Sequence, residues 1–292
     1  MQKFFKNCKN LAEYLAVIII IKTLGLVGID RSANICGYLA RKIGPLLSFH
    51  KIAKKNLQTI FPDILGHDKI LEETWDNFGR FIGEFPYINK ISDEQLEKRI
   101  EIIGLEHLLE FQKANQPFFL FTGHFANWDF ALKIIHKLYH KFIIIYRHAN
   151  NPYVDQMINE MRSSKNIHLV PKGAKGAREL IKSIKQHYAV GMLVDQKMND
   201  GIKVPFLNKS AMTSTAIAKL AMQFNWPIVP MQIIRTNGSY FKIIIHPSLL
   251  LPKTENRQAD CFNIMLNINE ILGSWVKQKP GQWFWFHNRW GK

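Results

Sequence analysis

The sequence predicts an α/β fold, a mostly parallel mixed sheet flanked by helices, with a helical segment before it. From residue 117 onwards, short apolar runs rich in β-branched and aromatic residues alternate with helical stretches. This alternation is typical of parallel strands joined by crossover helices. Before residue 114 the apolar residues follow a helical period instead. We therefore distinguish an N-terminal helix over 1–30 from a domain over 31–292, which is helical and basic over 31–113 and has its α/β core over 114–292.

The N-terminal helix contains the longest apolar run of the chain, LAEYLAVIIIIKTLGLVGI, at residues 11–29. A helix that spans a bilayer needs roughly 20 mostly apolar residues, and this run has about that length. Lys22 lies near its middle and costs a few kcal/mol on insertion unless its side chain reaches the interface. We expect residues 1–30 to be a membrane anchor that spans the bilayer or lies in its interface. The alternative is a buried first helix of a soluble domain.

The charge of the chain favours an anionic partner. Lys and Arg number 39 against 23 Asp and Glu, a net charge of +16. Residues 1–60 carry ten of the basic residues and only two acidic ones, so about half of the excess lies beside the expected anchor. Such an excess fits nucleic acid or an anionic membrane. We find no recognisable nucleic-acid-binding motif and therefore expect residues 31–113 to face an anionic membrane.

The remaining elements follow from the apolar runs and their breakers. An amphipathic helix over 32–62 ends at Pro62, and the segment 68–113 is helical in pattern. Asn237-Gly238 joins two apolar runs, 229–236 and 240–247, as an antiparallel hairpin. The other expected strands are 117–124, 141–147, 167–171, 189–195 and 227–234, and the other expected helices are 127–140, 152–165, 176–187, 213–225 and 256–279.

The sharpest local feature is FLFTGHFANWDFAL at residues 118–132, where a strand runs into His124 and Asp129 follows five residues later. Ligands of open α/β sheets bind beyond the carboxyl ends of strands, where such loops lie. Gly123 allows a tight turn and leaves room for a substrate beside His124. A carboxylate at Asp129 would accept the imidazole N–H and leave the other ring nitrogen free to take a proton. The spacing alone is weak, because a surface histidine and a helix-capping aspartate look the same.

No metal or disulfide is expected. His136 and His140 are four residues apart on one expected helix, but no HExxH glutamate and no third ligand accompany them. The three cysteines are odd in number and widely separated, which indicates a reducing compartment. The aromatic ending QWFWFHNRW fits core packing or an interfacial belt.

An ordered set of segments resembles the lipid A late-acyltransferase branch of the lysophospholipid acyltransferase superfamily, and it covers nearly the whole chain from about residue 45. The central piece resembles the superfamily's His-x4-Asp motif. One departure is Asn208, where the family often has glycine, although Asn tolerates positive φ. The matching segments are HKIAKKNLQTIFPD (50–63), TGHFANWD (122–129), IYRHANNPYVDQMINEMR (145–162), GMLVDQKMNDGIKVPFLNKSAMTSTAIAKLA (191–221), WPIVP (226–230) and the ending WFWFHNRW.

The resemblance implies a glycerolipid-acyltransferase-like fold and transfer of a fatty acyl group from acyl carrier protein to a hydroxyl of a phosphorylated lipid A precursor, with no cofactor and no nucleic acid. It implies a bacterial inner-membrane protein whose active site faces the cytoplasm. His124 would be the general base and Asp129 would orient it. The further candidates for substrate or oxyanion binding are Gly123, Asn127, Arg147, Arg162, Asp195 and Gln196.

Two alternatives stay open. A phospholipid or other glycolipid acyltransferase would use the same His-Asp chemistry, although VDQKMNDG stands where glycerol-phosphate acyltransferases carry an EGTR-like block. A non-catalytic, basic lipid-binding protein would also show the charge and the apolar N-terminus.

Overall fold

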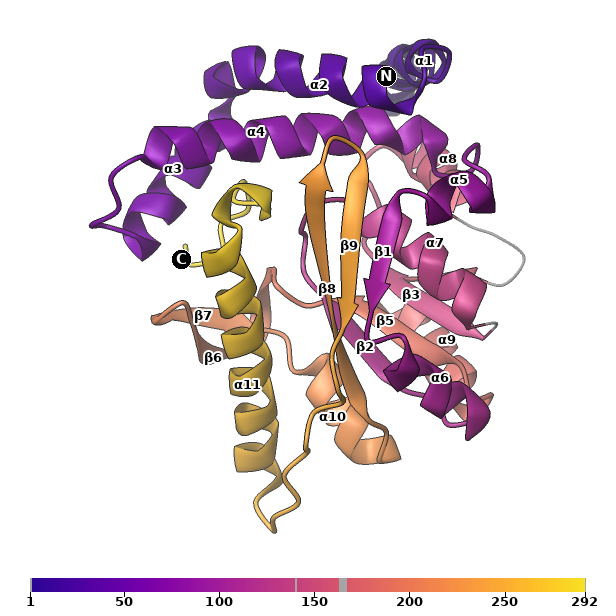
Figure 1. The fold of residues 1–292 in the computed structure, drawn as a ribbon, viewed down its shortest axis with the longest axis vertical. Helices are drawn as coiled ribbons and strands as arrows, with labels where there is room; N and C mark the ends of the chain where they lie inside the picture. Colours follow the sequence, from indigo (N-terminus) through magenta and orange to yellow (C-terminus); the bar gives the residue numbers. More distant parts are fainter. Residues whose placement is uncertain (1, 140, 163–166, 292) are drawn as a thin grey trace.

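A computed structural model describes residues 2–139, 141–162 and 167–291 of the chain (Figure 1). Its centre is a seven-stranded mixed sheet in the order β1-β9-β8-β2-β5-β3-β4. All neighbouring strands are parallel except β8 and β9, which form the hairpin that turns at Gly238. The strands are β1 Ile100–Ile103, β2 Phe119–Thr122, β3 Phe142–Tyr146, β4 Ile167–Pro171, β5 Ala189–Leu193, β8 Ile228–Asn237 and β9 Tyr240–Ile245.

Helices cover both faces of this sheet and bury two apolar clusters. One cluster packs β2, β3 and β8 residues against α6 and α7, with α8 at its margin. The other lies on the opposite face, against α9, α10 and α11. Successive strand residues point to opposite faces, so Phe119 and Phe121 join one cluster while Phe118 and Leu120 join the other. These helices are α6 Glu106–Lys113, α7 Trp128–Leu138, α8 Pro152–Arg162, α9 Ala174–Lys185, α10 Ala216–Phe224 and α11 Arg257–Gln278.

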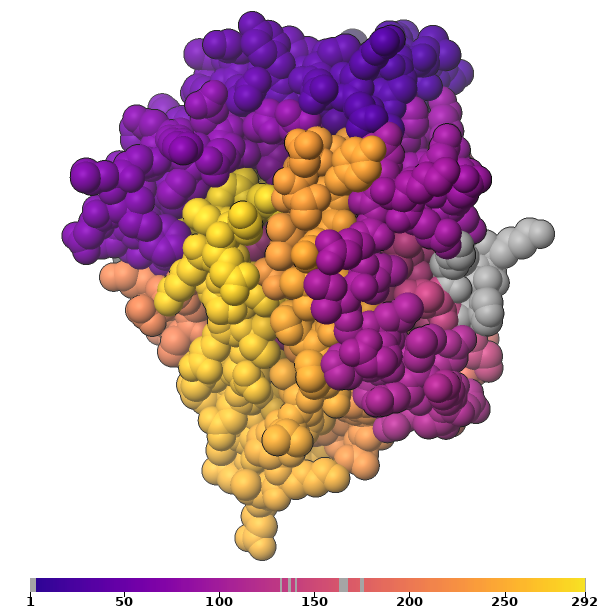
Figure 2. Space-filling view, in the orientation of Figure 1, coloured from indigo at the N-terminus to yellow at the C-terminus, as the bar shows by residue number. Residues whose placement is uncertain are grey.

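The N-terminal residues form a helical layer at one end of the molecule, indigo and violet in Figures 1 and 2. Helix α2 packs along α4 because Gly79 and Gly83 let the two backbones approach closely. A Cβ on Gly79 would lie 2.3 Å from the Cys36 carbonyl oxygen, and one on Gly83 would lie 2.5 Å from that of Ser32. The layer consists of α1 Gln2–Leu24, α2 Ile29–Ile43, η1 Gly44–Leu46, α3 Ser48–Ile60, α4 His67–Glu84, η2 Phe85–Tyr87 and α5 Asp93–Glu97.

The structure confirms the α/β class and the hairpin, and it corrects three elements. The helix expected over 32–62 is interrupted at Gly44 by η1, and the segment 68–113 contains strand β1. A separate hairpin, β6 Lys197–Phe206 with β7 Lys209–Thr213, was not expected from the sequence. Asn208 lies in its turn at a φ of 61°, so this asparagine adopts the left-handed conformation that the family's glycine favours.

The anchor expected over 1–30 stays a prediction. Within the described residues, none of the helices combines the length and the apolar character that crossing a bilayer requires. Helix α1 nevertheless exposes large apolar side chains along its length, namely Phe4, Phe5, Leu11, Leu15, Ile19 and Ile20.

Candidate active site

Two adjacent parallel strands bring His124 and Asp195 together. Strand β2 ends at Thr122 and β5 at Leu193, and these two residues are paired in the register. His124 and Asp195 follow at the carboxyl edge of the sheet, where the Nδ1 atom of His124 lies 2.7 Å from Oδ1 of Asp195. Asp195, a substrate-binding candidate in the sequence, is therefore the carboxylate that orients the imidazole.

The carboxylate of Asp195 is buried and accepts three kinds of N–H. Its Oδ2 accepts the backbone N–H of His124 and the indole N–H of Trp283, both at 2.8 Å. Burial by itself raises the pKa of Asp195, but the charge of His124 and these hydrogen bonds together bring the pKa well below its ordinary value. The carboxylate therefore stays ionised, and Nδ1 of His124 carries the proton that it accepts.

The second ring nitrogen of His124 is left as a proton acceptor. Nε2 lies 3.3 Å from the side-chain nitrogen of Gln196, which donates to it in this tautomer. The imidazole contacts the edge of Trp128, with ring centroids 4.9 Å apart, and lies near Phe284. An oriented imidazole with a free lone pair in aromatic surroundings is suited to general-base catalysis.

The structure corrects the expected contact of Asp129. Instead of accepting from His124, its Oδ2 accepts from Arg162 at 2.9 Å, which ties the start of α7 to the end of α8. Asp129 is buried, and its other oxygen and Nε of Arg162 have no hydrogen-bond partner within the described part of the chain. The arginine expected to bind an oxyanion or phosphate thus neutralises the motif's own carboxylate. A catalytic role for Asp129 stays a prediction.

Gly123 and Asn127 hold the loop between β2 and α7. A Cβ on Gly123 would lie 2.7 Å from the ring of Phe125 and 3.1 Å from Oδ2 of Asp195, so the space next to this glycine is filled by the protein rather than left for substrate. The side-chain oxygen of Asn127 caps α7 by accepting from the N–H groups of residues 129 and 130. Its amide donates to the buried carboxylate of Glu84 at 2.7 Å.

Glu84 joins this loop to the N-terminal layer and the hairpin. It is the last residue of α4, is fully buried, and pairs with both terminal nitrogens of Arg235 on β8. It also accepts from the hydroxyl of Ser239 at 2.8 Å. This network connects α4, the β8–β9 hairpin and Asn127, and so fixes the loop between β2 and α7 relative to α4.

The C-terminal tail supplies residues that the sequence did not identify. The backbone N–H of Phe284 donates to the His124 carbonyl and that of Ala126 to the Gln282 carbonyl, both at 3.0 Å. This pairing places the Trp283 indole on Asp195. From the sequence alone, the aromatic ending fits core packing and an interfacial belt equally well. Its role at the site follows only from the strand-like pairing with residues 124–126.

His287 lies behind the pair and is held neutral. Its Nε2 accepts the backbone N–H of Lys197 at 2.8 Å. Burial, the largest cause, and the charge of Arg289 lower its pKa to about 4 against the opposing effect of Asp195. A neutral His287 adds no positive charge next to His124.

An apolar cavity of about 290 Å³ opens beside the base, at the carboxyl ends of β3, β4 and β5. Ile145, Leu180, Met192 and Ile217 line it, and so does Gln196, which contacts His124. At its rim, burial lowers the pKa of Lys172, and the charge of Arg147 lowers it further. Arg147, which directly follows β3, is exposed, and its charge acts on Lys172.

No group of three or more histidine, cysteine or acidic side chains capable of holding a metal occurs among the described residues. The two histidines considered for zinc, His136 and His140, are not covered by that statement. His140 and the side chain of His136 lie outside the described residues.

A family model of bacterial lipid A biosynthesis acyltransferases matches residues 1–292. The chain belongs to this family. It is 24% identical over 247 residues to a lipid A biosynthesis lauroyltransferase of Escherichia coli, which covers 82% of this chain and 78% of that protein. It is also 24% identical over 243 residues to a lipid A biosynthesis acyltransferase of Haemophilus influenzae, which covers 80% and 73%. A rotor chain of the Euglena gracilis mitochondrial ATP synthase matches with a TM-score of 0.17 and 11% identity over 82% and 80% of the two chains, which is too weak to inform the fold.

Membership of the lipid A biosynthesis acyltransferase family confirms the resemblance found in the sequence. It supports an acyltransferase role in lipid A biosynthesis. The segments that carried the resemblance, TGHFANWD and the block containing Asp195 and Gln196, are the ones that the sheet brings together.

Proposed function

We propose that the chain transfers a fatty acyl group from acyl carrier protein to a hydroxyl of a phosphorylated lipid A precursor of the Kdo-lipid IVA type. The observation that carries the proposal is the Asp195–His124 pair, whose unprotonated Nε2 contacts Gln196, a residue that lines the apolar cavity. This arrangement has a base and its orienting carboxylate but uses no protein nucleophile. The nucleophile is then the hydroxyl of the acceptor.

The reaction follows from the tautomer of His124. Nε2 removes the proton of the acceptor hydroxyl while the hydroxyl oxygen forms a bond to the thioester carbonyl carbon. The tetrahedral intermediate expels the carrier thiolate, which takes the proton back from Nε2, so an ester and a free thiol result. Such general-base catalysis is worth roughly 10²–10⁴-fold. Gln196 and Arg147 are the candidate donors to the developing oxyanion.

The apolar cavity suits the acyl chain. Apolar side chains such as Ile145, Leu180, Met192 and Ile217 dominate its lining, to which Lys172 and Lys197 are the charged contributors. Burying methylene groups there contributes roughly 0.8 kcal/mol each. Because Gln196 lines this cavity and contacts His124, a bound chain would end with its carbonyl near the base.

The N-terminal layer supports binding to an anionic membrane. Along η1 and α3, exposed Leu46 and Phe49 are followed by exposed Lys51, Lys54 and Lys55. Apolar side chains enter the interface while lysines meet anionic headgroups, each worth about 1 kcal/mol near such a surface. We place the chain on the cytoplasmic face of the bacterial inner membrane, where an acyl carrier protein donor is found.

The reaction is tested by offering membrane-bound wild type and His124→Ala acyl carrier protein loaded with lauroyl, myristoyl or palmitoyl chains. Kdo-lipid IVA and lysophosphatidic acid compete as acceptors, and products are identified by mass spectrometry. We expect acylation of Kdo-lipid IVA, its loss in His124→Ala, and its retention in the control His107→Ala on α6. Acylation of lysophosphatidic acid alone would favour the phospholipid alternative, and transfer from acyl-coenzyme A at an equal rate would contradict the carrier-protein donor.

Membrane binding is tested by vesicle flotation. We expect binding to phosphatidylglycerol-containing vesicles that weakens with salt and in a Lys51→Glu, Lys54→Glu, Lys55→Glu variant. Equal binding to neutral phosphatidylcholine vesicles would contradict an anionic-surface role for these lysines.

A further inference from the structure

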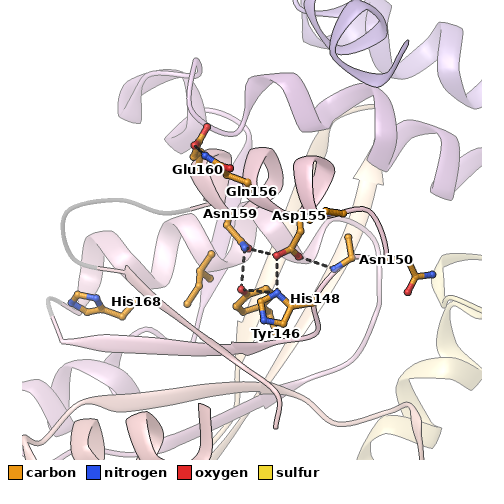
Figure 3. Close-up of a pocket in the computed structure, with 11 residues that line it drawn as sticks. Tyr146, His148, Asn150, Asp155, Gln156, Asn159, Glu160 and His168 are labelled. Atoms are coloured by element: carbon orange, nitrogen blue, oxygen red, sulfur yellow. Dashed lines mark hydrogen bonds and ion pairs between the residues drawn. The ribbon is translucent and has the colours of Figure 1, made fainter. Parts of the chain in front are cut away.

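A second His–Asp pair lines an open, polar cavity of about 830 Å³ between α8 and the ends of β3 and β4 (Figure 3). His148 follows β3, and its Nδ1 lies 2.7 Å from Oδ2 of Asp155 on α8. Tyr146 and Asn159 complete the cluster, with the amide of Asn159 donating to the Tyr146 hydroxyl at 3.0 Å. The proposed transfer reaction uses none of these four side chains.

This polar cavity and the apolar cavity occupy opposite faces of the same strand end. Ile145 lines the apolar cavity and the next residue, Tyr146, lines the polar one, because successive strand residues point to opposite faces. Only β5 separates β3 from β2, the strand that carries His124. With strands about 4.8 Å apart, the two strand ends lie roughly 10 Å from each other. A headgroup bound in the polar cavity would therefore lie on the face of the sheet opposite the acyl chain, two strands from the strand that leads to His124.

Counting hydrogens shows what the polar cavity offers to a ligand. Nδ1 of His148 donates its proton to Asp155, so it cannot accept the hydroxyl proton of Tyr146, whose oxygen lies 3.3 Å away. The Tyr146 hydroxyl accepts from Asn159 and keeps a proton to donate. Nε2 of His148 is then an acceptor on a side chain that is 57% exposed. Oδ1 of Asn159 also has no hydrogen-bond partner among the described residues, but it is buried and is therefore not offered to a ligand.

One unused donor, the Tyr146 hydroxyl, and one exposed acceptor, Nε2 of His148, match sugar hydroxyl groups, each of which both donates and accepts. They do not match a phosphate, because the Asp155 carboxylate faces the same space and repels anions. We propose that the polar cavity binds sugar hydroxyls of the glycolipid acceptor, an assignment that rests on the proposed function. Phosphate groups would instead meet the exposed Arg147, whose charge acts on Lys172 of the apolar cavity.

Helix α8 connects this site to the catalytic loop. It contributes Asp155 and Asn159 to the polar cavity and, about 10 Å further along, Arg162 to the ion pair with Asp129. A sugar held by α8 is thereby positioned relative to the His124 loop by a rigid helix.

The test uses Tyr146→Phe, which removes one hydroxyl and keeps the ring. Tyr153→Phe is the matched control, since Tyr153 lies on α8, the helix that carries Asp155 and Asn159, but packs against Tyr14, with ring centroids 6.0 Å apart. In acyl transfer to the glycolipid we expect Tyr146→Phe to raise the KM for the acceptor about fivefold, the typical worth of one hydrogen bond. The kcat and the KM for the acyl donor should stay within twofold, and Tyr153→Phe should match the wild type. An unchanged acceptor KM would overturn the proposal.

A binding measurement separates this site from the reaction. The full chain in detergent is mixed with dephosphorylated glucosamine disaccharide, and saturation-transfer NMR reports contact with the sugar protons. We expect a signal in wild type, His124→Ala and Tyr153→Phe that weakens about fivefold in Tyr146→Phe. Absence of binding to wild type, or displacement of the sugar by inorganic phosphate, would overturn the sugar site. Sugar binding without acyl transfer to any glycolipid would instead overturn the proposed function.

Discussion

The two His–Asp pairs at the carboxyl edge of the sheet share one geometry and differ in their surroundings. In both, Nδ1 of the histidine lies 2.7 Å from a carboxylate oxygen. His124 and Asp195 are only 16% and 2% exposed, whereas His148 and Asp155 are 57% and 13% exposed.

The resemblance extends to the other donors of each carboxylate. Asp195 accepts from a backbone N–H and the indole of Trp283, and Asp155 accepts from the backbone N–H of Ala149 and the amide of Asn159. The difference in burial therefore decides the role. Exclusion of water strengthens the buried pair and makes its tautomer unique, while the exposed pair is left to orient a polar surface.

The strongest test of this comparison is Asp195→Asn against Asp155→Asn. An amide at residue 195 no longer enforces the proton on Nδ1, so we expect kcat to fall roughly 10²–10⁴-fold. Asp155→Asn should change kcat less than threefold, because its histidine takes no part in proton transfer. Initial rates at saturating donor and acceptor, with circular dichroism to verify folding, measure both. Equal losses would contradict the assignment of different roles.

His287, a neighbour of the buried pair, should make the stability of the fold sensitive to acid. The pKa of His287 is lowered to about 4 in the folded chain against about 6.5 when unfolded, so its contribution to stability is complete above pH 6.5 and is lost as pH falls toward 4. Between pH 7 and pH 5 this amounts to about 2 kcal/mol. His287→Gln keeps an acceptor for the Lys197 N–H and should flatten the decline of Tm over this range. An unchanged decline would assign it to other groups.

Asp129 and Arg162 should behave as one unit, distinct from the Asp195 pair. Asp129→Asn and Arg162→Gln each remove the same buried ion pair, so the double variant should be no less stable than the worse single one. The corresponding coupling free energy is about 1–3 kcal/mol. Urea unfolding of the three variants measures it. Additive losses would show that the ion pair contributes nothing to stability.

The smallest expected effect is that of the indole on Asp195. Trp283→Phe removes one donor to the carboxylate and should lower kcat about fivefold. Trp285→Phe is the matched control, because its equally buried indole donates to the Pro280 carbonyl instead. The two variants should lose similar Tm but differ in kcat. Equal kcat values would remove Trp283 from the site.

Local patterns predicted most of the sheet and the base, while the partners of the base depend on the tertiary structure. The apolar runs and the Asn237-Gly238 turn are encoded in neighbouring residues, and so is the strand-to-helix loop that carries His124. Strand β1 escaped prediction because its four residues, Ile100–Ile103, sit between polar helical segments. The pairing of His124 with Asp195 depends on β5 lying beside β2, a strand order that no local pattern specifies. Asp129 was assigned to His124 from proximity in sequence, and its actual partner is 33 residues away on α8.

The hydrogen bonds of buried Glu84 fix the distance between the loop that carries His124 and the N-terminal helices. Glu84 joins α4 to Asn127 directly, and α4 in turn packs along α2 with glycines at the contact. With the N-terminal layer resting on a bilayer, as proposed, α2 and α4 rather than a flexible tether would set the height of His124 above the lipid surface. The height of each hydroxyl above the lipid surface would then select among the hydroxyls of one glycolipid, since only a hydroxyl at the height of His124 can reach its Nε2.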